Sequence, residues 1–293
     1  GTTRKEKANL ERLSALEIKK QVKIIRCNLE NIKQTKNVIE RSNPKEIYNL
    51  SAQSSVGESF RKPIETQKSI VNTTLNILEV CRTINFSDKI FFAGSSEIFG
   101  STEKPADMKT DIDLRSPYAT AKYQSFLLVK LYREIYKINC VTGILFNHES
   151  SLRDERFVIK KIIKTAIQIK FGKKIKLILG DLSIKRDWGH AEEYVEAMQL
   201  ITRAEQNKDY IICTGKSHSL ESIVEKVFQQ LDLDYKDHIK ISKDLYRSNE
   251  IQTSSGSPIS IFEDLGWKSN MNIDKLIQIL IYDEIKKTKI SLY

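Results

Sequence analysis

Lys89-Ile90-Phe91-Phe92-Ala93-Gly94-Ser95-Ser96-Glu97 is the stretch of this sequence that decides its fold class. Its apolar run is short and ends in glycine and small polar residues, which is typical of a buried strand in a parallel sheet. Similar short apolar runs cover residues 21–26, 46–50 and 139–146. Apolar residues at helical spacing occupy residues 31–41, 62–82 and 116–136. Because such helices can connect parallel strands, the alternation predicts an α/β fold with a parallel sheet.

The pattern changes from about residue 157 onward. Helices now alternate with short strands at residues 176–179 and 210–213, and a last helix is predicted over residues 273–286. We predict an α/β domain over residues 1–156 and a smaller C-terminal part over residues 157–293. The boundary is soft, and segments of the two parts can interleave.

Composition and charge restrict the classes of partner. The 293 residues are 40% hydrophobic, and no apolar run approaches the length of about 20 residues that a membrane-spanning helix needs, so we expect a soluble protein with no membrane partner. The net charge is +10, but acidic and basic residues are interleaved, and even the basic run at residues 160–176 alternates with apolar residues. This distribution favours solvated helix faces over a nucleic-acid surface, so we expect no nucleic-acid partner.

The four cysteines predict a cellular compartment. They lie far apart and mostly within apolar stretches, at positions Cys27, Cys81, Cys140 and Cys213. This distribution predicts buried, reduced thiols in a cytoplasmic protein. No His, Cys or carboxylate spacing indicates a metal site.

The residues best suited to chemistry follow the third predicted strand and open the next helix. Ser95, Ser96 and Glu97 stand at the strand end, where ligands of parallel sheets collect. Tyr118 and Lys122 lie one helical turn apart on one face. A lysine ammonium near a phenol favours the phenolate, so Tyr118 could act as a base. Glu97 would supply a second, independent acid or base.

These motifs resemble those of a known superfamily. Tyr-x-x-x-Lys after a strand that ends in Ser-Ser-Glu is similar to the extended short-chain dehydrogenase/reductase superfamily, which implies a Rossmann-like doubly wound parallel sheet. Within it, the sequence resembles the GDP-mannose 4,6-dehydratase family. The stretches that carry this likeness are residues 48–54, 94–100, 115–119, 143–150 and 185–198, with weaker correspondence at Tyr246-Arg247, Glu250 and Leu265-Gly266-Trp267.

The resemblance implies an internal redox dehydration of a nucleotide sugar with NADP as cofactor. Tyr118 would take the proton of the sugar 4-hydroxyl as hydride leaves C4, assisted by Ser95 where the family usually has Thr. Glu97 would then remove the C5 proton and help to expel the 6-hydroxyl as water. Because hydride returns to C6, the cofactor is not consumed. The expected catalytic set is Ser95, Ser96, Glu97, Tyr118 and Lys122.

The resemblance also implies ligand-binding residues. The expected cofactor-binding residues are Arg4, Lys5, Asn28, Leu29, Leu50, Ser51, Ala52, Gln53, Ser54, Tyr118, Lys122, His148 and Arg153. The residues expected to bind the GDP end of the sugar nucleotide are Asn147, Lys160, Arg186, Arg247 and Glu250. Asp187 is expected to do no more than orient Arg186. The family likeness also implies a homo-oligomer, either a dimer or a tetramer.

The sequence departs from the family in one large feature. It contains no G-x-x-G-x-x-G or G-x-G-x-x-G turn, the motif whose backbone approaches the cofactor pyrophosphate. Residues 1–4 resemble the end of the family's second strand, so we expect the first strand and its glycine turn to precede Gly1. Two alternatives stay open: a degenerate homologue that acts as a binding or assembly module without catalysis, and a dehydratase that acts on a related GDP-heptose.

Overall fold

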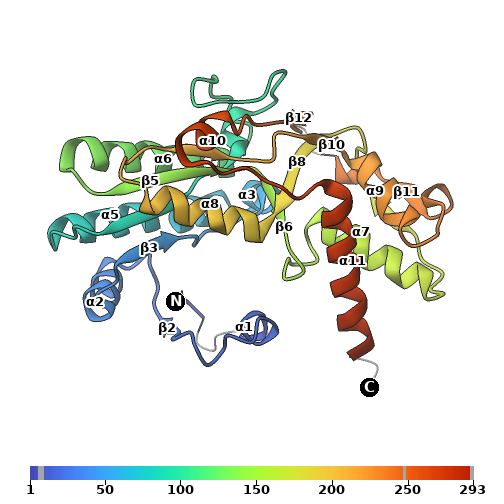
Figure 1. Ribbon diagram of the computed structural model, residues 1–293, viewed down its shortest axis with the longest axis horizontal. Helices are drawn as coiled ribbons and strands as arrows, with labels where there is room; N and C mark the ends of the chain where they lie inside the picture. Colours follow the sequence, from blue (N-terminus) through green and yellow to red (C-terminus); the bar gives the residue numbers. More distant parts are fainter. Residues whose placement is uncertain (6–9, 247–248, 291–293) are drawn as a thin grey trace. The chain divides into compact units, whose positions relative to one another are not determined.

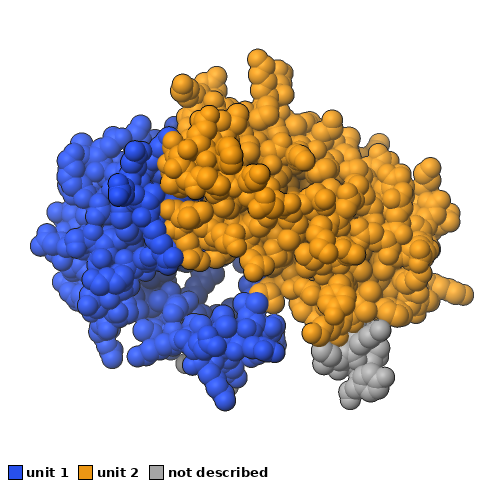
Figure 2. Space-filling view, in the orientation of Figure 1, with its two compact units in different colours: residues 1–94, 116–143, 201–209 blue, residues 95–115, 144–200, 210–293 orange. Residues whose placement is uncertain are grey.

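The computed structural model describes residues 1–5, 10–246 and 249–290. The chain divides into two compact units that alternate along the sequence (Figure 2). Unit 1 contains residues 1–94, 116–143 and 201–209, and unit 2 contains residues 95–115, 144–200 and 210–293. Each unit is therefore assembled from segments that are distant in sequence.

The sheet of unit 1 is parallel and buried. It contains β3 (Glu46–Asn49), β4 (Lys89–Ala93) and the part of β5 (Cys140–Leu145) that belongs to this unit. β4 is central and pairs in parallel with both neighbours. Ile90 and Phe91 are fully buried, as expected for a strand covered on both faces. The predicted parallel sheet is confirmed.

Helices cover this sheet (Figure 1). They are α2 (Ile32–Ser42), α3 (Val56–Arg61), α4 (Pro63–Gln67), α5 (Thr73–Thr83) and α6 (Pro117–Tyr136), with the π-helical turn η1 (Lys68–Asn72) between α4 and α5. The predicted helix over residues 62–82 is therefore real but changes its hydrogen-bond pattern at η1. Leu78 on α5 and Val129 on α6 join Ile90 in one buried cluster, so these helices pack onto the apolar strand.

The N-terminal segment corrects one prediction. A strand was predicted over residues 21–26, but only β2 (Ile25–Arg26) is extended, and it pairs in parallel with β1 (Thr2–Thr3). Between them lies the short helix α1 (Glu11–Ala15), which the sequence pattern did not predict. Just before β2, the carbonyl oxygen of Lys23 accepts a hydrogen bond of 2.7 Å from the amino group of Gly1.

Unit 2 is built around β8 (Lys185–His190). This strand pairs in parallel with β6 (Asn147–Glu149) and β12 (Thr253–Ser254), and antiparallel with β10 (Ser217–Ser219). A separate parallel pair joins β7 (Leu177–Leu179) to β11 (Ile239–Ile241). The remaining strand is β9 (Tyr210–Ile212).

The helices of unit 2 enclose its core. They are α7 (Val158–Lys170), α8 (Ala191–Arg203, whose last three residues belong to unit 1), α9 (Leu220–Gln229), α10 (Ile259–Leu265) and α11 (Ile273–Ile290), with 3₁₀ turns η2 (Ser96–Phe99), η3 (Tyr235–Asp237) and η4 (Lys243–Leu245). Ile162 on α7, Val224 on α9 and Ile277 on α11 meet in one buried cluster. No helix among the described residues is both long and apolar enough to cross a membrane.

Candidate active site

The start of α6 positions the predicted tyrosine and lysine. Ser116 caps the helix by accepting a hydrogen bond from the backbone N–H of Ala119 at 3.0 Å, and Pro117 occupies the first turn, where it needs no N–H partner. The cap fixes the helical phase, which brings Lys122 onto the face of Tyr118. The Lys122 Nζ lies 5.8 Å from the centroid of the Tyr118 ring. The predicted pairing of these two side chains is thus present in unit 1.

Lys122 is held at the end of β4. Its Nζ donates a hydrogen bond of 2.7 Å to the carbonyl oxygen of Ala93, the last residue of that strand. The side chain is buried, with 8% of its residue surface exposed. Burial disfavours the ammonium form and lowers the pKa of Lys122 to about 8. A lysine with this pKa can exchange a proton near neutral pH.

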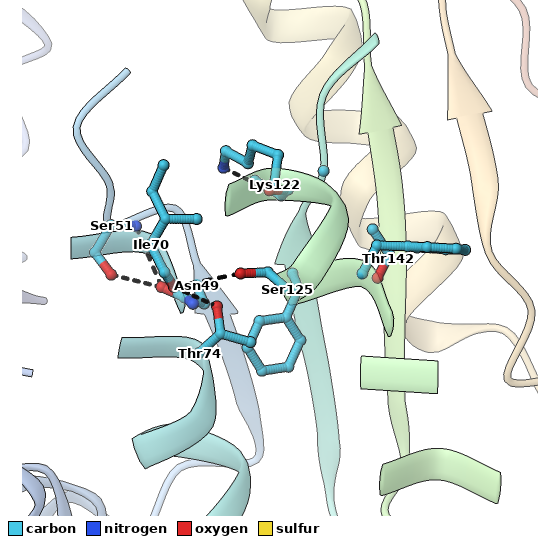
Figure 3. A pocket seen from close by; sticks show the side chains of 11 residues that line it. Asn49, Ser51, Ile70, Thr74, Lys122, Ser125 and Thr142 are labelled. Carbon is cyan, nitrogen blue, oxygen red and sulfur yellow. Dashed lines mark hydrogen bonds between the residues drawn. The ribbon is translucent and has the colours of Figure 1, made fainter. Parts of the chain in front are cut away.

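A small cavity adjoins Lys122 within unit 1 (Figure 3). Its volume is about 10 Å³, which is room for about one water molecule. It is lined at the ends of β3 and β4 by Asn49 and Gly94, on β5 by Thr142 and on α6 by Lys122 and Ser125. The Thr142 hydroxyl is buried and has no hydrogen-bond partner among the described residues. Polar groups therefore converge at the carboxyl ends of the parallel strands.

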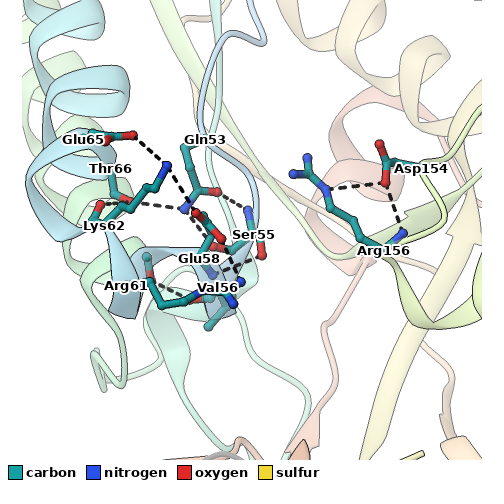
Figure 4. Close-up of polar contacts among 11 residues, drawn as sticks. Gln53, Ser55, Val56, Glu58, Arg61, Lys62, Glu65, Thr66, Asp154 and Arg156 are labelled. Carbon is teal, nitrogen blue, oxygen red and sulfur yellow. Dashed lines mark hydrogen bonds and ion pairs between the residues drawn. The ribbon is translucent and has the colours of Figure 1, made fainter. Parts of the chain in front are cut away.

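The predicted cofactor loop at residues 50–54 follows β3. The Ser51 hydroxyl donates a 2.5 Å hydrogen bond to the Asn49 side chain. The Gln53 amide donates to the Ser55 carbonyl oxygen at 2.8 Å and to the Thr66 hydroxyl at 3.1 Å (Figure 4). These bonds fix the loop from within, so the Gln53 side chain supports the loop rather than projecting from it. The exposed members of the loop are Leu50, Ser51 and Ser54.

The other predicted cofactor residues of unit 1 lie at the carboxyl ends of β1 and β2. The Arg4 guanidinium is largely exposed, and its Nη1 lies 3.7 Å from the Glu30 carboxylate. Asn28 follows β2, and its side chain accepts a hydrogen bond from the Glu30 N–H at 3.2 Å. Lys5 follows β1, and Leu29 uses its carbonyl oxygen to accept from the Asn76 amide at 2.9 Å. The structure thus brings these basic and polar groups together beside one pair of strands.

Ser95, Ser96 and Glu97 belong to unit 2, where Ser95 precedes η2 as its cap and Ser96 and Glu97 are its first two residues. The Ser95 hydroxyl caps this turn by accepting from the Glu97 N–H at 3.4 Å. Both serines are buried, and Ser95 directly follows Gly94, the last residue of the first segment of unit 1. The capping bond explains why a small hydroxyl residue follows this strand.

β6 carries two of the predicted ligand residues, Asn147 and His148. The strand predicted over residues 139–146 corresponds to β5, and the residues that follow it form a separate strand, β6, which pairs with β8. The His148 Nδ1 lies 2.8 Å from the carbonyl oxygen of Phe146, and its ring packs against Tyr194 at a centroid distance of 4.8 Å. Burial lowers the pKa of His148 to about 4, so the ring is neutral at physiological pH.

Gly189, opposite His148 in the strand register, keeps room for this stack. A Cβ at this position would lie 2.4 Å from a ring carbon of Tyr194, so any other residue would displace that ring. Tyr194 itself is fully buried, and sequence reasoning missed it. The nearest sequence signal for Tyr194 is its position four residues after the Asp-Trp-Gly-His stretch at residues 187–190. Because α8 begins directly after that stretch, this spacing determines which helix face Tyr194 occupies.

Arg153 and Glu149 form a second feature of unit 2. The Arg153 Nε lies 3.4 Å from Glu149 Oε2, and the Glu149 carboxylate is 3% exposed. Burial raises the pKa of Glu149 to about 7, although Arg153 and Lys160 act in the opposite direction. Sequence reasoning predicted Arg153 and missed Glu149. A charged residue inside a short buried strand is the signal that could have found it.

Arg186 and Glu250, both predicted to bind substrate, contact each other directly. The Arg186 Nη2 donates to Glu250 Oε1 at 2.8 Å. The prediction that Asp187 orients Arg186 is wrong. Asp187 instead accepts from the backbone N–H groups of Thr214 and Gly215 at 2.9 and 2.8 Å, and thereby holds the turn after β9. Strand alternation explains this difference, because neighbouring residues of β8 point to opposite faces.

Two further predicted substrate residues have different outcomes. Lys160 is buried on α7, where its Nζ lies 2.5 Å from a Glu284 carboxylate oxygen and 3.0 Å from the Ser151 carbonyl oxygen. Its charge is thus already paired within unit 2. Arg247 lies outside the described residues. Over the described part of the chain, no group of three or more His, Cys, Asp or Glu residues could hold a metal ion.

Solved structures define the class of protein to which this fold belongs. The chain is similar to a structure described as RMD from Pseudomonas aeruginosa complexed with NADPH, with a TM-score of 0.82, 20% sequence identity and coverage of 90% of each chain. It is also similar to DesIV, a dTDP-glucose 4,6-dehydratase from Streptomyces venezuelae with NAD and TYD bound, with a TM-score of 0.86, 15% identity and coverage of 96% of this chain and 85% of that one. At these identities the likeness shows the fold, and the predicted Rossmann-like α/β fold is confirmed.

Sequence comparison identifies the family within that class. A family model described as GDP-mannose 4,6 dehydratase matches residues 1–280. The chain is 38% identical to GDP-mannose 4,6 dehydratase 1 of Arabidopsis thaliana, over 84% of this chain and 69% of that protein. It is 33% identical to GDP-mannose 4,6 dehydratase of Homo sapiens, over 85% of this chain and 72% of that protein. The chain belongs to the GDP-mannose 4,6-dehydratase family, as the sequence motifs predicted.

Proposed function

We propose that this protein catalyses the NADP-dependent dehydration of GDP-mannose to GDP-4-keto-6-deoxymannose. The observation that carries the proposal is Lys122, a buried lysine one turn after Tyr118 that is held by the last carbonyl group of β4. Ser95, Ser96 and Glu97 follow that strand in the chain. Membership of the dehydratase family supports the substrate and the reaction.

The residues present fit NADP, a nicotinamide adenine dinucleotide phosphate. Lys122 contacts no carboxylate among the described residues, so its donors are suited to ribose hydroxyls and the Tyr118 phenol. In unit 2, the Arg153 Nε is buried without a hydrogen-bond partner among the described residues. NADP would supply a hydride acceptor that later returns the hydride, so the overall reaction is redox-neutral. The residues that would hold it are Arg4, Lys5, Asn28, Leu29, Leu50, Ser51, Ala52, Gln53, Ser54, Tyr118, Lys122, His148 and Arg153.

The chain's own residues handle the protons. The Lys122 ammonium stabilises the phenolate form of Tyr118, which accepts the proton of the sugar 4-hydroxyl. Ser95 donates a hydrogen bond to the sugar oxygen at C4, and Ser96 supports the turn. Oxidation at C4 acidifies the C5 hydrogen, which Glu97 removes as a proton. Glu97 gives this proton to the 6-hydroxyl, which leaves as water, and Tyr118 returns its own proton to C5 when hydride is added at C6. One water leaves for each sugar converted.

The two parts of the sequence divide the binding roles. Residues 1–156 mainly bind NADP, and residues 157–293 mainly bind the nucleotide of the sugar. The GDP end is bound by Asn147, Lys160, Arg186, Arg247 and Glu250. Arginine guanidinium groups suit the diphosphate because they donate two parallel hydrogen bonds. The contact between Arg186 and Glu250 supports a joint role for these two residues.

We also propose that the protein forms a homo-oligomer, either a dimer or a tetramer. Leu127, Leu131 and Ile135 recur every fourth residue on α6 and are 45%, 48% and 65% exposed. A second copy of this chain would cover this apolar face. Sedimentation equilibrium of the protein and of Leu131→Glu tests this: the substitution should yield monomers, and a monomeric parent protein would reject the oligomer.

A cytoplasmic location completes the proposal. All four cysteines are buried and free, which suits a reducing compartment. Fractionation of cells that express the tagged protein tests the location, and recovery with membranes or in the secreted fraction would reject it.

Product analysis tests the reaction. The purified protein is incubated with GDP-mannose and NADP⁺, and a 4-keto-6-deoxy product is sought by mass spectrometry as a loss of water. Tyr118→Phe, which keeps the ring and removes the acid–base group, should abolish the product. Conversion of a GDP-heptose but not of GDP-mannose would reject the substrate. Binding of both nucleotides without turnover would favour the non-catalytic module.

A further inference from the structure

A buried carboxylate beside Arg153 has no role in the proposed chemistry. Glu149 lies at the end of β6 and is 3% exposed, yet its Oε2 has no hydrogen-bond partner among the described residues. The Arg153 Nε, 3.4 Å away, also lacks one there. The two groups form an ion pair without a hydrogen bond. Unsatisfied buried polar groups are rare in folded proteins, and they concentrate where a ligand or a catalytic task accounts for them.

The guanidinium of Arg153 is restrained from several sides. Its central carbon lies 3.7 Å from the centroid of the Phe157 ring, a cation–π distance. Glu149 faces its Nε edge. The backbone is held too, because the Arg153 N–H donates to the Ser150 carbonyl oxygen at 3.0 Å. These contacts leave the two terminal nitrogens, Nη1 and Nη2, without an acceptor among the described residues.

The neighbouring backbone is anchored by two lysines. The Ser151 carbonyl oxygen accepts from Lys160 Nζ at 3.0 Å and from Lys287 Nζ at 2.6 Å. The turn that carries Arg153 is therefore tied to both α7 and α11. The Arg153 guanidinium is thus held on one face by Phe157 and at Nε by Glu149. A guanidinium held in this way can bind a phosphoryl group with two parallel hydrogen bonds from its terminal nitrogens.

We propose that Glu149 and Phe157 are positioning residues that hold Arg153 so that its two terminal nitrogens bind a phosphoryl group of a nucleotide ligand. This inference rests on the proposed function, which supplies two such ligands, the dinucleotide cofactor and the sugar nucleotide. Both offer the same phosphoryl chemistry. Positioning of Arg153 explains why a carboxylate is buried at the end of β6 in unit 2.

The test measures ligand affinity and fold stability separately. Dissociation constants for NADP⁺ and for GDP are determined by calorimetry for the parent protein and for Glu149→Gln, and thermal unfolding is recorded for both. We expect Glu149→Gln to weaken binding of one nucleotide about tenfold without lowering the melting temperature, because the substitution also removes a buried charge. The nucleotide whose affinity changes is the phosphate source. A role confined to structure would instead lower the melting temperature.

Matched controls come from the same loop. Glu155→Gln removes an exposed carboxylate that pairs with Lys164, and Arg156→Met removes an exposed guanidinium that pairs with Asp154 at 3.8 Å (Figure 4). Neither should change either affinity more than twofold. Arg153→Met should weaken the same nucleotide, and adding Glu149→Gln to it should cause no further loss, because Glu149 acts through Arg153.

Three outcomes would overturn the inference. Additive losses in the double variant would mean that Glu149 does not act through Arg153. Unchanged affinity for both nucleotides in Glu149→Gln, in a parent protein that binds them, would reject the inference and leave the proposed function intact. A parent protein that binds neither NADP⁺ nor GDP would reject both.

Discussion

Lys122 in unit 1 and Lys160 in unit 2 are both buried lysines on long helices, but only Lys160 has a carboxylate partner among the described residues. Lys160 is 9% exposed and its Nζ lies 2.5 Å from the Glu284 carboxylate. Lys122 is 8% exposed and donates to the neutral Ala93 carbonyl oxygen. A buried ammonium is costly unless it is paired, so the unpaired lysine is the one whose position calls for a functional explanation.

The difference has an electrostatic consequence. Burial lowers the pKa of Lys122 to about 8, because no carboxylate compensates for the lost hydration. Lys160, which joins α7 to α11, has such a carboxylate partner in Glu284. A lysine that stabilises the phenolate of a neighbouring tyrosine is more effective when no carboxylate already neutralises its charge.

The largest expected effect is on catalysis by Lys122→Met. We expect turnover of GDP-mannose to fall by about 10³-fold to 10⁴-fold, which is about 4 to 5.5 kcal/mol of transition-state stabilisation. The melting temperature should stay within a few degrees of the parent value, because an unpaired buried charge is removed together with one hydrogen bond. Steady-state kinetics and thermal unfolding check this. Retained turnover would remove the functional distinction between the two lysines.

The second prediction concerns Lys160→Met. It leaves the Glu284 carboxylate buried without its lysine, which we expect to reduce the free energy of unfolding by about 4 kcal/mol. The double variant Lys160→Met/Glu284→Leu should recover most of this loss, because neither charge then remains buried. Urea denaturation measures both. A stable single variant would show that the ion pair contributes little to the packing of α7 against α11.

The sequence predicted those features that depend on local pattern. The strand that contains Phe91 was predictable because its apolar run is short and ends in glycine. The approach of Lys122 to Tyr118 followed from helical spacing alone. The helix over residues 62–82 was predicted, but its π-helical turn at η1 was not, because hydrogen-bond shifts within a helix leave the apolar spacing almost unchanged.

Contacts between distant segments could not be predicted in the same way. Lys160 and Glu284 are 124 residues apart, and nothing in the sequence near either one indicates its partner. The error over Asp187 has a similar origin, because its acceptor role depends on Thr214, 27 residues later. Sequence adjacency to Arg186 was misleading, since adjacent residues in a strand face opposite sides.

The third prediction uses pH to separate the two lysines. Below about pH 8, Lys122 is protonated in both the folded and the unfolded protein, so its burial penalty is fully present. Between about pH 8 and 10.5, the folded protein releases this proton while the unfolded chain retains it, so stability should rise relative to Lys122→Met. The relative gain should approach about 3 kcal/mol. Urea denaturation of both proteins at several pH values measures it, and parallel curves would contradict the depressed pKa.

The smallest expected effect tests whether the exposure of a lysine determines how much its contact contributes to the free energy of unfolding. Lys287 is exposed, and its Nζ donates to the Ser151 carbonyl oxygen, which also accepts from the buried Lys160. Lys287→Met should therefore reduce the free energy of unfolding by only about 0.5 to 1 kcal/mol, because water and Lys160 still satisfy that oxygen. Urea denaturation beside Lys160→Met gives the comparison directly. A loss as large as that of Lys160→Met would show that tethering the turn, rather than pairing a buried charge, makes Lys160 important.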